Sequence, residues 1–551
     1  MQIVDDKALV LRTRNPHKYA IIPKHKVLSE TDGIFEVAVY WGLDEARVLR
    51  NLGVKDVPSP ITRRYDWPGK FIPMAHQIET AAFLTMNRRA FCFNDPGTGK
   101  TLSALWAADF LMNRGEVRRI LILCPLSIMH SAWMGDINRS VIHRSAIVAH
   151  HAQASRRIEM IQQDYEIVIA NYDGLNLIAS EINADGRFDL VIVDEANAYK
   201  NPSTRRWKTL ASIIKPETYL WMMTGTPASQ SPVDAYGLAR FVNPSGVPKF
   251  QTSWRDKVMN KISMFKWAPK ANAKELVYEA LQPAIRFTKD QCLDLPPVFT
   301  VTREVPMTPQ QAKYYKLLKE QMLFQAAGET ISAVNAGVAV NKLLQISCGA
   351  AYTDEKEVVE FDSAPRLGVL EEVLEETSRK VIIFALFRSS IDTIVTYLTK
   401  HGYAVDQIHG DVSATKRGQI INDFQTTDNI RVLVLQPQAT AHGITLTAAD
   451  TVVFYGPLMS VEMYTQCIAR ADRKGQDSDK VTVVHIESSP PREEAFQGNE
   501  YKSFRSRPAR RHVRQRSKKY LRKELQINLV VLCCQTIDNK IIQGEVNVKH
   551  R

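Results

Sequence analysis

The sequence predicts an α/β protein built mainly from two parallel-sheet domains, and three observations support this prediction. The chain has 551 residues, which is long for one domain and suits two or three. Continuous apolar runs, typical of strands buried on both faces, recur in both halves of the chain. These runs alternate with segments of helical pattern, which is typical of parallel sheets.

Changes in pattern divide the chain into five expected segments. They are a small accessory α+β unit, a first α/β lobe, a helical insertion or linker, a second α/β lobe and a basic tail, at residues 1–60, 65–240, 241–362, 363–488 and 489–551. The accessory unit shows strand-like runs and then a helical pattern, at Ala8–Leu11, Tyr19–Ile22, Phe35–Trp41 and Asp44–Leu52. Within the insertion, residues 308–348 have a helical pattern.

The two lobes are predicted from their strands. In the first lobe, the apolar runs are Ile120–Cys124, Glu166–Tyr172, Leu190–Val193 and Leu220–Met223. In the second lobe, they are Val381–Phe384, Ala404–Ile408, Val432–Leu435, Thr451–Tyr455 and Val481–Ile486. We expect each set to form one parallel sheet.

Composition narrows the class of protein. Hydrophobic residues make up 45% and charged residues 24%, as in ordinary globular proteins. No apolar run approaches the ~18 residues of a membrane-spanning helix, and the first residues do not resemble a secretory signal. The seven cysteines show no metal-binding spacing. We therefore expect a cytoplasmic protein without membrane contact, zinc or disulfides.

The positive charge is concentrated in one segment. The net charge is +12, and residues 501–525 carry eleven basic residues against one acid, so the rest of the chain sums to +2. A basic tail suits a polyanion such as nucleic acid. An unstructured, solvated tail is an equal alternative.

A glycine-rich stretch, Asn94–Thr101, lies between a predicted strand and a predicted helix, the context of a phosphate-binding loop. Small residues let backbone N–H groups surround phosphate oxygens, here at Pro96, Gly97, Thr98 and Gly99. Lys100 would reach the β- and γ-phosphates of ATP, and Thr101 would bind Mg²⁺. The strict pattern has glycine where this chain has Asn94. The alternative is a turn that binds nothing.

Gln77 lies about twenty residues before this loop. A glutamine amide both donates and accepts hydrogen bonds, so Gln77 could bind the edge of an adenine base. The alternative is an ordinary surface glutamine.

Two carboxylates, Asp194 and Glu195, directly follow the apolar run Leu190–Val193. Acids at the end of a buried strand are costly unless they bind something. Asp194 would hold Mg²⁺ through water, and Glu195 would orient and deprotonate the attacking water. The alternative is a pair of exposed loop acids. A further strand ends in Thr224–Pro227, where Thr224 and Thr226 could relay between the nucleotide and a second ligand.

Together, Asn94–Thr101, Asp194–Asn197 and Thr224–Pro227 resemble the motor of superfamily-two helicases, and most closely the Swi/Snf-type DNA-translocating ATPases. Supporting likenesses are Cys124–Ser127 followed by Trp133, Tyr172, and Phe241–Pro244. The chain departs from the family at Asn197, where the family usually has histidine. That position is associated with coupling to nucleic acid rather than with hydrolysis.

The resemblance implies two RecA-like lobes and adds site residues from the second lobe. Thr440–Thr447 resembles the fifth motif, in which His442, Gly443 and Thr445, together with Thr224 and Thr226, would contact nucleic acid. Gln466–Gln476 resembles the sixth motif, in which Gln466 would bind the nucleotide. Arg470 and Arg473, three apart and expected on one helical face, would act as arginine fingers. For Thr440–Thr447, the alternative is an ordinary loop between two strands. For Arg470 and Arg473, the alternative is a pair of solvated helix arginines without a role in the site.

The resemblance implies a monomeric motor that couples hydrolysis of Mg²⁺-bound ATP to movement along DNA, with duplex favoured. The compact design, without a visible chromodomain or zinc-finger module, leads us to expect a bacterial or phage origin. Two alternatives remain. One is a strand-separating DNA or RNA helicase of the same superfamily. The other is a nucleotide-dependent DNA-binding protein with weak or no turnover. The departures at Asn94 and Asn197 keep this alternative open, and the intact motif residues Lys100, Asp194, Glu195, Arg470 and Arg473 argue against it.

Overall fold

The computed structural model describes residues 1–228, 231–263, 267–292, 295–328, 333–352, 358–440 and 444–489. His442, Gly443 and the basic tail from residue 490 onward therefore lie outside the described residues. The chain divides into two compact units. The first contains residues 1–303, 370–456 and 462–486, and the second contains residues 304–369, 457–461 and the chain from residue 487 onward.

The N-terminal segment forms a four-stranded antiparallel sheet followed by a helix. The strands lie in the order β1-β2-β4-β3, with bounds β1 Gln2–Val4, β2 Ala8–Thr13, β4 Ile34–Tyr40 and β3 His25–Thr31. Alternate residues of β2 and β4, such as Leu9 and Val37, are buried in a small core of their own. Helix α1 (Leu43–Asn51) contributes Leu49 to the same core.

One prediction for this segment is wrong. Tyr19–Ile22 is not a strand, because a 3₁₀ helix (Pro16–Tyr19) and a turn occupy this stretch. Proline suits the first turn of a helix, and the turn allows both Tyr19 and Ile22 to reach the core. Strand β3 was not anticipated, since its residues are almost all exposed and show no apolar alternation.

The first lobe contains a seven-stranded sheet in which every pair of neighbouring strands is parallel, as predicted. In spatial order, the strands are β13 Ala284–Ile285, β5 Arg89–Cys92, β10 Tyr219–Met223, β9 Phe188–Val193, β6 Arg119–Cys124, β8 Ile167–Asn171 and β7 Ala146–Val148. The carboxyl ends of parallel strands meet at one edge of a sheet, which is where ligands bind in such folds.

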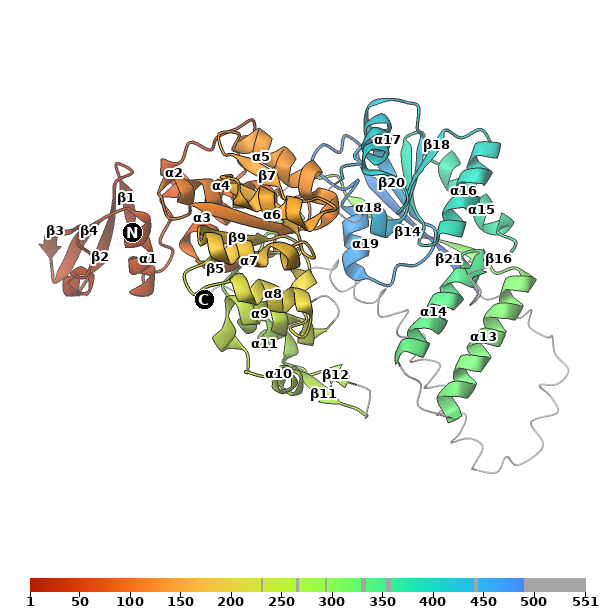
Figure 1. Ribbon diagram of the computed structural model, residues 1–551, viewed down its shortest axis with the longest axis horizontal. Coiled ribbons are helices and arrows are strands. Elements are labelled where there is room, and N and C mark those ends of the chain that lie inside the picture. The colour runs from red at the N-terminus through yellow and green to blue at the C-terminus, as the bar shows by residue number, and fades with distance from the viewer. Residues whose placement is uncertain are drawn as a thin grey trace. The chain divides into compact units, whose positions relative to one another are not determined.

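Helices cover both faces of this sheet (Figure 1). Ile120 and Ile122 share a core with α3 Ala75–Met86, α4 Lys100–Asn113 and α5 Gly135–Ser140. Leu121 and Leu123 face the other way, into a core with α6 Ala154–Gln162, α7 Leu175–Asp185, α8 Arg205–Ile213 and α9 Ala235–Val242. A strand buried on both faces explains the unbroken apolar run at 120–124.

The chain after α9 continues to contribute to the first lobe. It forms α10 Gln251–Val258, the hairpin β11 Met259–Lys261 and β12 Trp267–Pro269, α11 Ala273–Ala280, and β13 at the sheet edge. Trp254 of α10 and Ala273 of α11 are buried in the same core as α9. The short helix α12 (Lys289–Cys292) follows β13.

The second lobe contains a six-stranded sheet in the order β14-β21-β20-β17-β19-β18. Its strands are β14 Val298–Pro306, β21 Val481–Ser489, β20 Ala449–Phe454, β17 Lys380–Phe384, β19 Val432–Leu435 and β18 Val405–Ile408. The pairs from β21 to β18 are parallel, as predicted. The helices of this region are α15 Ala364–Glu375, α16 Arg388–Lys400, α17 Ala414–Thr426, α18 Pro437–Thr440 and α19 Val461–Ile468.

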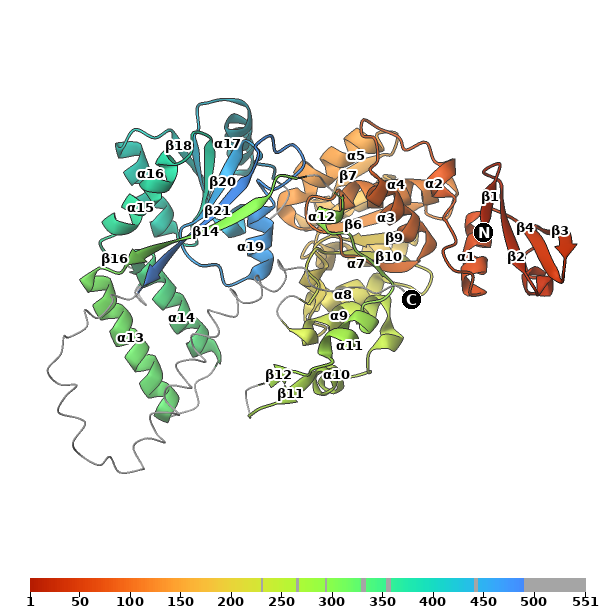
Figure 2. The ribbon, with the colours of Figure 1, turned by 180° about the vertical axis from the view of Figure 1, so that it is seen from behind.

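The second unit is dominated by two helices that lie side by side, α13 (Pro309–Gly328) and α14 (Ala333–Ser347) (Figure 2). They fall within the stretch predicted to be helical. Gln311 Nε2 donates to the backbone oxygen of Ile346 at 3.0 Å and joins the two helices. A hairpin of β15 (Ala350–Tyr352) and β16 (Val358–Glu360) follows. In the ranges that the structure describes, no helix is both long and apolar enough to cross a membrane.

Candidate functional site

The predicted phosphate loop lies between β5 and α4, at the carboxyl edge of the first sheet. Two glycines give it its shape. Gly97 and Gly99 have φ of 90° and 80°, a conformation that side chains other than glycine rarely adopt. A Cβ at Gly99 would also lie 2.1 Å from Gln77 Nε2, so a side chain here would displace the Gln77 amide.

Asn94, where the chain departs from the strict loop pattern, is a structural residue. Its side chain is 1% exposed. Its Nδ2 donates to Thr80 Oγ1 at 2.9 Å, and its Oδ1 accepts from the backbone N of Phe287 at 3.0 Å. The amide thus ties the start of the loop to α3 and to the chain after β13, which a glycine could not do.

We therefore expect Asn94→Gly, which restores the strict pattern, to destabilise the protein. The buried Thr80 and the partly buried Phe287 would each lose a hydrogen bond, and a buried group left without its partner costs about 1–3 kcal/mol. Urea unfolding should show a lower midpoint than for wild type. Asn429→Gly, in an exposed loop, is the matched control and should change little. An Asn94→Gly protein as stable as this control would contradict the role given to Asn94.

Lys100 and Thr101 begin helix α4, where a helix terminus favours anions. Lys100 Nζ donates to the backbone oxygens of Asn94 at 2.7 Å and Asp95 at 3.2 Å. A bound phosphate would be a stronger partner for this ammonium group than two neutral carbonyls. The loop therefore fits a phosphate-bearing ligand.

Gln77 is not a surface residue, since it is 2% exposed. Its Oε1 accepts from the backbone N of Met74 at 2.9 Å, and its Nε2 lies 3.4 Å from the backbone oxygen of Gly99. The neighbouring His76 is hydrogen-bonded to the backbone oxygen of Thr98 at 2.8 Å. The start of α3 thus supports the phosphate loop, and contact between Gln77 and a base stays a prediction.

Asp194 and Glu195 follow β9, and they are not exposed loop acids. Asp194 is 8% exposed. Its Oδ2 accepts from Trp133 Nε1 at 3.0 Å, and its Oδ1 accepts from the backbone N of Glu195 at 3.0 Å. The Tyr172 hydroxyl donates to the backbone oxygen of Asp194 at 2.5 Å. Trp133 and Tyr172, noted in the sequence only for their likeness to a family, thus hold the acidic pair in place.

The acidic pair has an unusual electrostatic environment. Burial raises the pKa of Asp194, and the charge of Lys100 opposes this shift. Burial, and next the charge of Asp194, raise the pKa of Glu195 to about 7. Glu195 also has φ of 47°, which is uncommon for a residue with a side chain. A buried and a half-buried carboxylate, both with raised pKa values, fit a site for a divalent cation, with Asp194 and Thr101 as the predicted ligands.

The turn Thr224–Pro227 follows β10, which lies between β5 and β9 in the sheet. It therefore sits between the phosphate loop and the acidic pair. A Cβ at Gly225 would lie 2.8 Å from Pro96 Cδ, so the turn packs directly on the loop. Thr224 is fully buried, and the backbone oxygen of Thr226 accepts from Asn197 Nδ2 at 2.9 Å. Contact of these threonines with nucleic acid stays a prediction, as it does for Thr445, which is partly exposed.

The expectation that Arg470 and Arg473 share a helical face is wrong. Helix α19 ends at Ile468, and both arginines lie in the turns that follow. The backbone N of Arg470 donates three residues back, to Cys467, which tightens the chain beyond the helix. Both side chains still converge, since each Nη1 donates to the backbone oxygen of Ile444, at 3.2 and 3.3 Å.

These arginines are not solvated surface residues. Burial, and next the charge of Arg473, lower the pKa of Arg470 to about 10. Burial also lowers the pKa of Arg473. A Cβ at Gly97 would lie 3.8 Å from Arg473 Cγ, and Gln466 Nε2 is 3.4 Å from Glu195 Oε1. Within the first unit, the sixth motif therefore reaches the phosphate loop and the acidic pair.

Lys289 is a residue of this site that the sequence did not single out. Its Nζ donates to the carboxylate of Asp472 at 2.8 Å and to the backbone oxygen of the same residue at 2.6 Å. Its backbone N donates to Asp95 Oδ2 at 3.2 Å. It thus joins the phosphate loop to the segment between the two arginines. A lone lysine after a short strand gives no sequence signal for this role.

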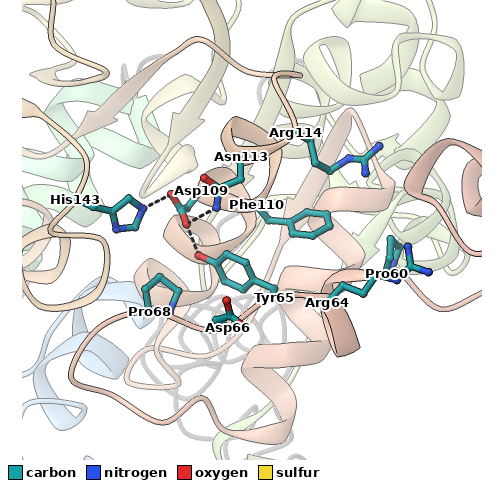
Figure 3. Close-up of a pocket in the computed structure, with 10 residues that line it drawn as sticks. All are labelled: Pro60, Arg64, Tyr65, Asp66, Pro68, Asp109, Phe110, Asn113, Arg114 and His143. Carbon is teal, nitrogen blue, oxygen red and sulfur yellow. Dashed lines mark hydrogen bonds and ion pairs between the residues drawn. The ribbon is translucent and has the colours of Figure 1, made fainter. Parts of the chain in front are cut away.

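A separate cavity of about 380 Å³ lies near the other end of α4 (Figure 3). Its walls include Asp109, whose carboxylate accepts from Tyr65 at 2.6 Å and contacts His143 at 2.8 Å. Arg144 also donates to this carboxylate at 2.6 Å. The Asp109 carboxylate is thus neutralised by its neighbours. The cavity lies near the end of α4, whereas Lys100 lies at its start, so this cavity is distinct from the candidate phosphate site.

The fold and the site together define a class: two parallel α/β lobes with a phosphate loop, a buried acidic pair and converging arginines. Residues 76–348 match the SNF2-related domain, and residues 366–475 match the helicase conserved C-terminal domain. The chain belongs to superfamily two and is of the Snf2 type.

Relatives agree with this assignment. The chain is 26% identical over 453 residues to the SWI/SNF-related matrix-associated actin-dependent regulator of chromatin subfamily A-like protein 1 homolog of Caenorhabditis elegans, covering 80% of this chain and 62% of that one. It is 26% identical over 417 residues to the ATP-dependent DNA helicase DDM1 of Arabidopsis thaliana, covering 69% and 54%. The chain thus spans less than two thirds of the length of these curated relatives.

Among solved structures, the chain is similar to the Sulfolobus solfataricus SWI2/SNF2 ATPase core in complex with dsDNA. The sequence identity is 20% and the TM-score is 0.38. The match covers 77% of this chain and 89% of that one.

Proposed function

We propose that the protein is a nucleic-acid-dependent ATPase that couples hydrolysis to movement along DNA. The observation that carries this proposal is the grouping of Lys100, Asp194 and Glu195 at one sheet edge, with Glu195 hydrogen-bonded to Gln466 of the sixth motif. A phosphate loop, an acidic pair and a second-lobe motif are the parts that phosphoryl transfer to water requires.

Each residue has a role in this chemistry. Lys100 would hold the phosphates, while Thr101 and Asp194 would hold Mg²⁺, which would supply positive charge against the phosphates. Glu195 orients the attacking water and accepts its proton. Arg470 and Arg473 stabilise the charge that develops on the transferred phosphoryl group. These residues come from both lobes. Assembly of the site around ATP, followed by its release after hydrolysis, would therefore move one lobe against the other.

Duplex DNA is the proposed track. The family assignment supports it, and one relative is by name an ATP-dependent DNA helicase. Contacts to the phosphate backbone rather than to bases would make movement independent of sequence. Strand separation and an RNA track are the remaining alternatives. A monomeric motor, a cytoplasmic location and a bacterial or phage origin stay predictions; the two curated relatives named above are eukaryotic.

The test is the steady-state ATPase rate of the full chain without nucleic acid, with duplex DNA, with single-stranded DNA and with RNA. We expect low basal turnover and strong stimulation by duplex DNA. Stronger stimulation by single-stranded DNA or by RNA would support a nucleic-acid-dependent ATPase but would contradict duplex DNA as the nucleic acid along which it moves. No turnover under any of these conditions would contradict the proposal and favour a nucleotide-dependent binding protein.

A further inference from the structure

A second basic segment lies in the first lobe, and the structure describes it except for residues 264–266. Residues 249–274 contain seven basic residues and one acid, a net charge of +6 in 26 residues. The tail at 501–525 carries +10 of the total of +12. Everything outside these two segments therefore sums to −4. Without the tail and this segment, the chain would therefore carry a net negative charge.

The segment consists of helix α10, the β11–β12 hairpin and the start of helix α11, and it is attached to the core of the first lobe. Trp254 and Val258 of α10 are fully buried, and Trp254 Nε1 donates to the backbone oxygen of Pro232 at 3.2 Å. In the hairpin, Lys261 of β11 pairs with Trp267 of β12. At its base, the backbone N of Lys270 donates to the backbone oxygen of Val258 at 2.9 Å. In both views, β11 and β12 lie at the end of the lobe formed by α10 and α11 (Figures 1 and 2).

The cations that the structure describes in this hairpin segment have little carboxylate neutralisation. Lys249, Lys257, Lys261 and Lys274 are exposed. Among the described residues, the segment's one carboxylate ion pair joins the adjacent Arg255 and Asp256 at 3.8 Å, and Lys270 donates to a backbone oxygen. Several cations elsewhere on the lobe do form close ion pairs. Arg118, Arg144 and Arg187 each donate to carboxylates at 2.6–2.8 Å.

Apolar side chains lie exposed among these lysines. Phe250 is 62% exposed, with Lys249 Nζ 5.6 Å from its ring centre, and Ile262 is 60% exposed. The Arg255 guanidinium lies 4.4 Å from the ring centre of Trp267. A solvated face that served only solubility would not need several cations of one sign with so little carboxylate neutralisation on one hairpin segment. Concentrated, unpaired positive charge on a protruding element fits a polyanion.

We propose that the described parts of this segment, residues 249–263 and 267–274, form a second nucleic-acid contact, which binds the phosphate backbone of duplex DNA separately from the ATP-coupled track. This inference goes beyond the proposed function, because none of its residues belongs to the ATP site. Lysine contacts to phosphates carry no sequence information and are weakened strongly by salt. The hairpin would therefore hold flanking duplex rather than read its sequence.

The test is the salt dependence of duplex binding by the full-length protein, measured by fluorescence anisotropy. The variant K257A/K261A/K274A removes three exposed charges. We expect weaker binding and a slope of log Kd against log salt that is shallower by about one for each lysine that contacts a phosphate. The matched control, K55A/K208A/K400A, removes three exposed lysines from other places and should keep the wild-type slope.

Equal slopes for the two triple variants would overturn the proposal and leave an acidic protein surface as the hairpin's partner. The ATPase rate at saturating duplex DNA separates this result from failure of the proposed function. A wild-type protein that duplex DNA does not stimulate would contradict the motor, whereas the comparison of slopes would still decide the role of the hairpin. Thermal unfolding of both variants should match wild type, because the replaced side chains are exposed.

Discussion

Glu195→Gln is expected to abolish nearly all ATP hydrolysis while making the protein more stable at neutral and alkaline pH. Glutamine keeps the shape of the side chain and cannot accept a proton, and loss of a general base costs about 10²–10⁴-fold in rate. The measurement is the duplex-stimulated ATPase rate. Glu217→Gln, in an exposed turn, is the control and should retain full activity. A Glu195→Gln rate within tenfold of wild type would remove Glu195 from the mechanism.

The stability effect follows from the pKa of Glu195, which burial raises to about 7. Below the pKa of the unfolded chain, near 4.5, the side chain is protonated in both states and costs nothing. As pH rises toward 7, the unfolded state loses the proton first, so the free energy of unfolding of the wild type falls. The glutamine variant has no such loss. We expect it to exceed wild type by on the order of 2 kcal/mol at pH 8 and by much less at pH 5, measured by urea unfolding without nucleotide.

Arg473→Lys is expected to reduce the duplex-stimulated turnover number by about 10³-fold or more, the typical effect of losing an arginine finger. Lysine keeps the charge but lacks the planar, multidentate guanidinium. Since Arg473 lies beside Gly97 of the phosphate loop, the loss should appear mainly in the turnover number rather than in KM.

Arg431→Lys is the matched control for this prediction. Arg431 lies in the same lobe and also donates to backbone oxygens, those of Leu374 and Thr377, at 2.7 and 2.8 Å. It directly precedes β19, and neither of the residues that accept its hydrogen bonds belongs to the site. We expect it to lower stability and to leave turnover unchanged. If both variants keep more than a tenth of the wild-type rate, Arg473 does not act on the phosphoryl group.

Much of the fold could be predicted because its signals are local. The run Ile120–Cys124 is apolar throughout since both faces of its strand are buried, and the alternation of its residues between two cores shows why. Strand β3 gave no signal, because a strand with its side chains exposed lacks the pattern that burial imposes. The prediction of a strand at Tyr19–Ile22 was wrong, because its apolar residues reach the core through a turn rather than along a strand.

The candidate site, like the fold, has features that the sequence predicts and features that it does not. The residue types of the loop, the acidic pair and the two arginines are set by chemistry, so the sequence by itself determined which side chains a phosphate site requires. Only the tertiary structure decided how they are held. Asn94 binds Thr80 and Phe287, and Lys289 binds Asp472, across large separations in the chain. Such contacts leave no periodic trace in sequence, because folding alone brings their partners within hydrogen-bonding distance.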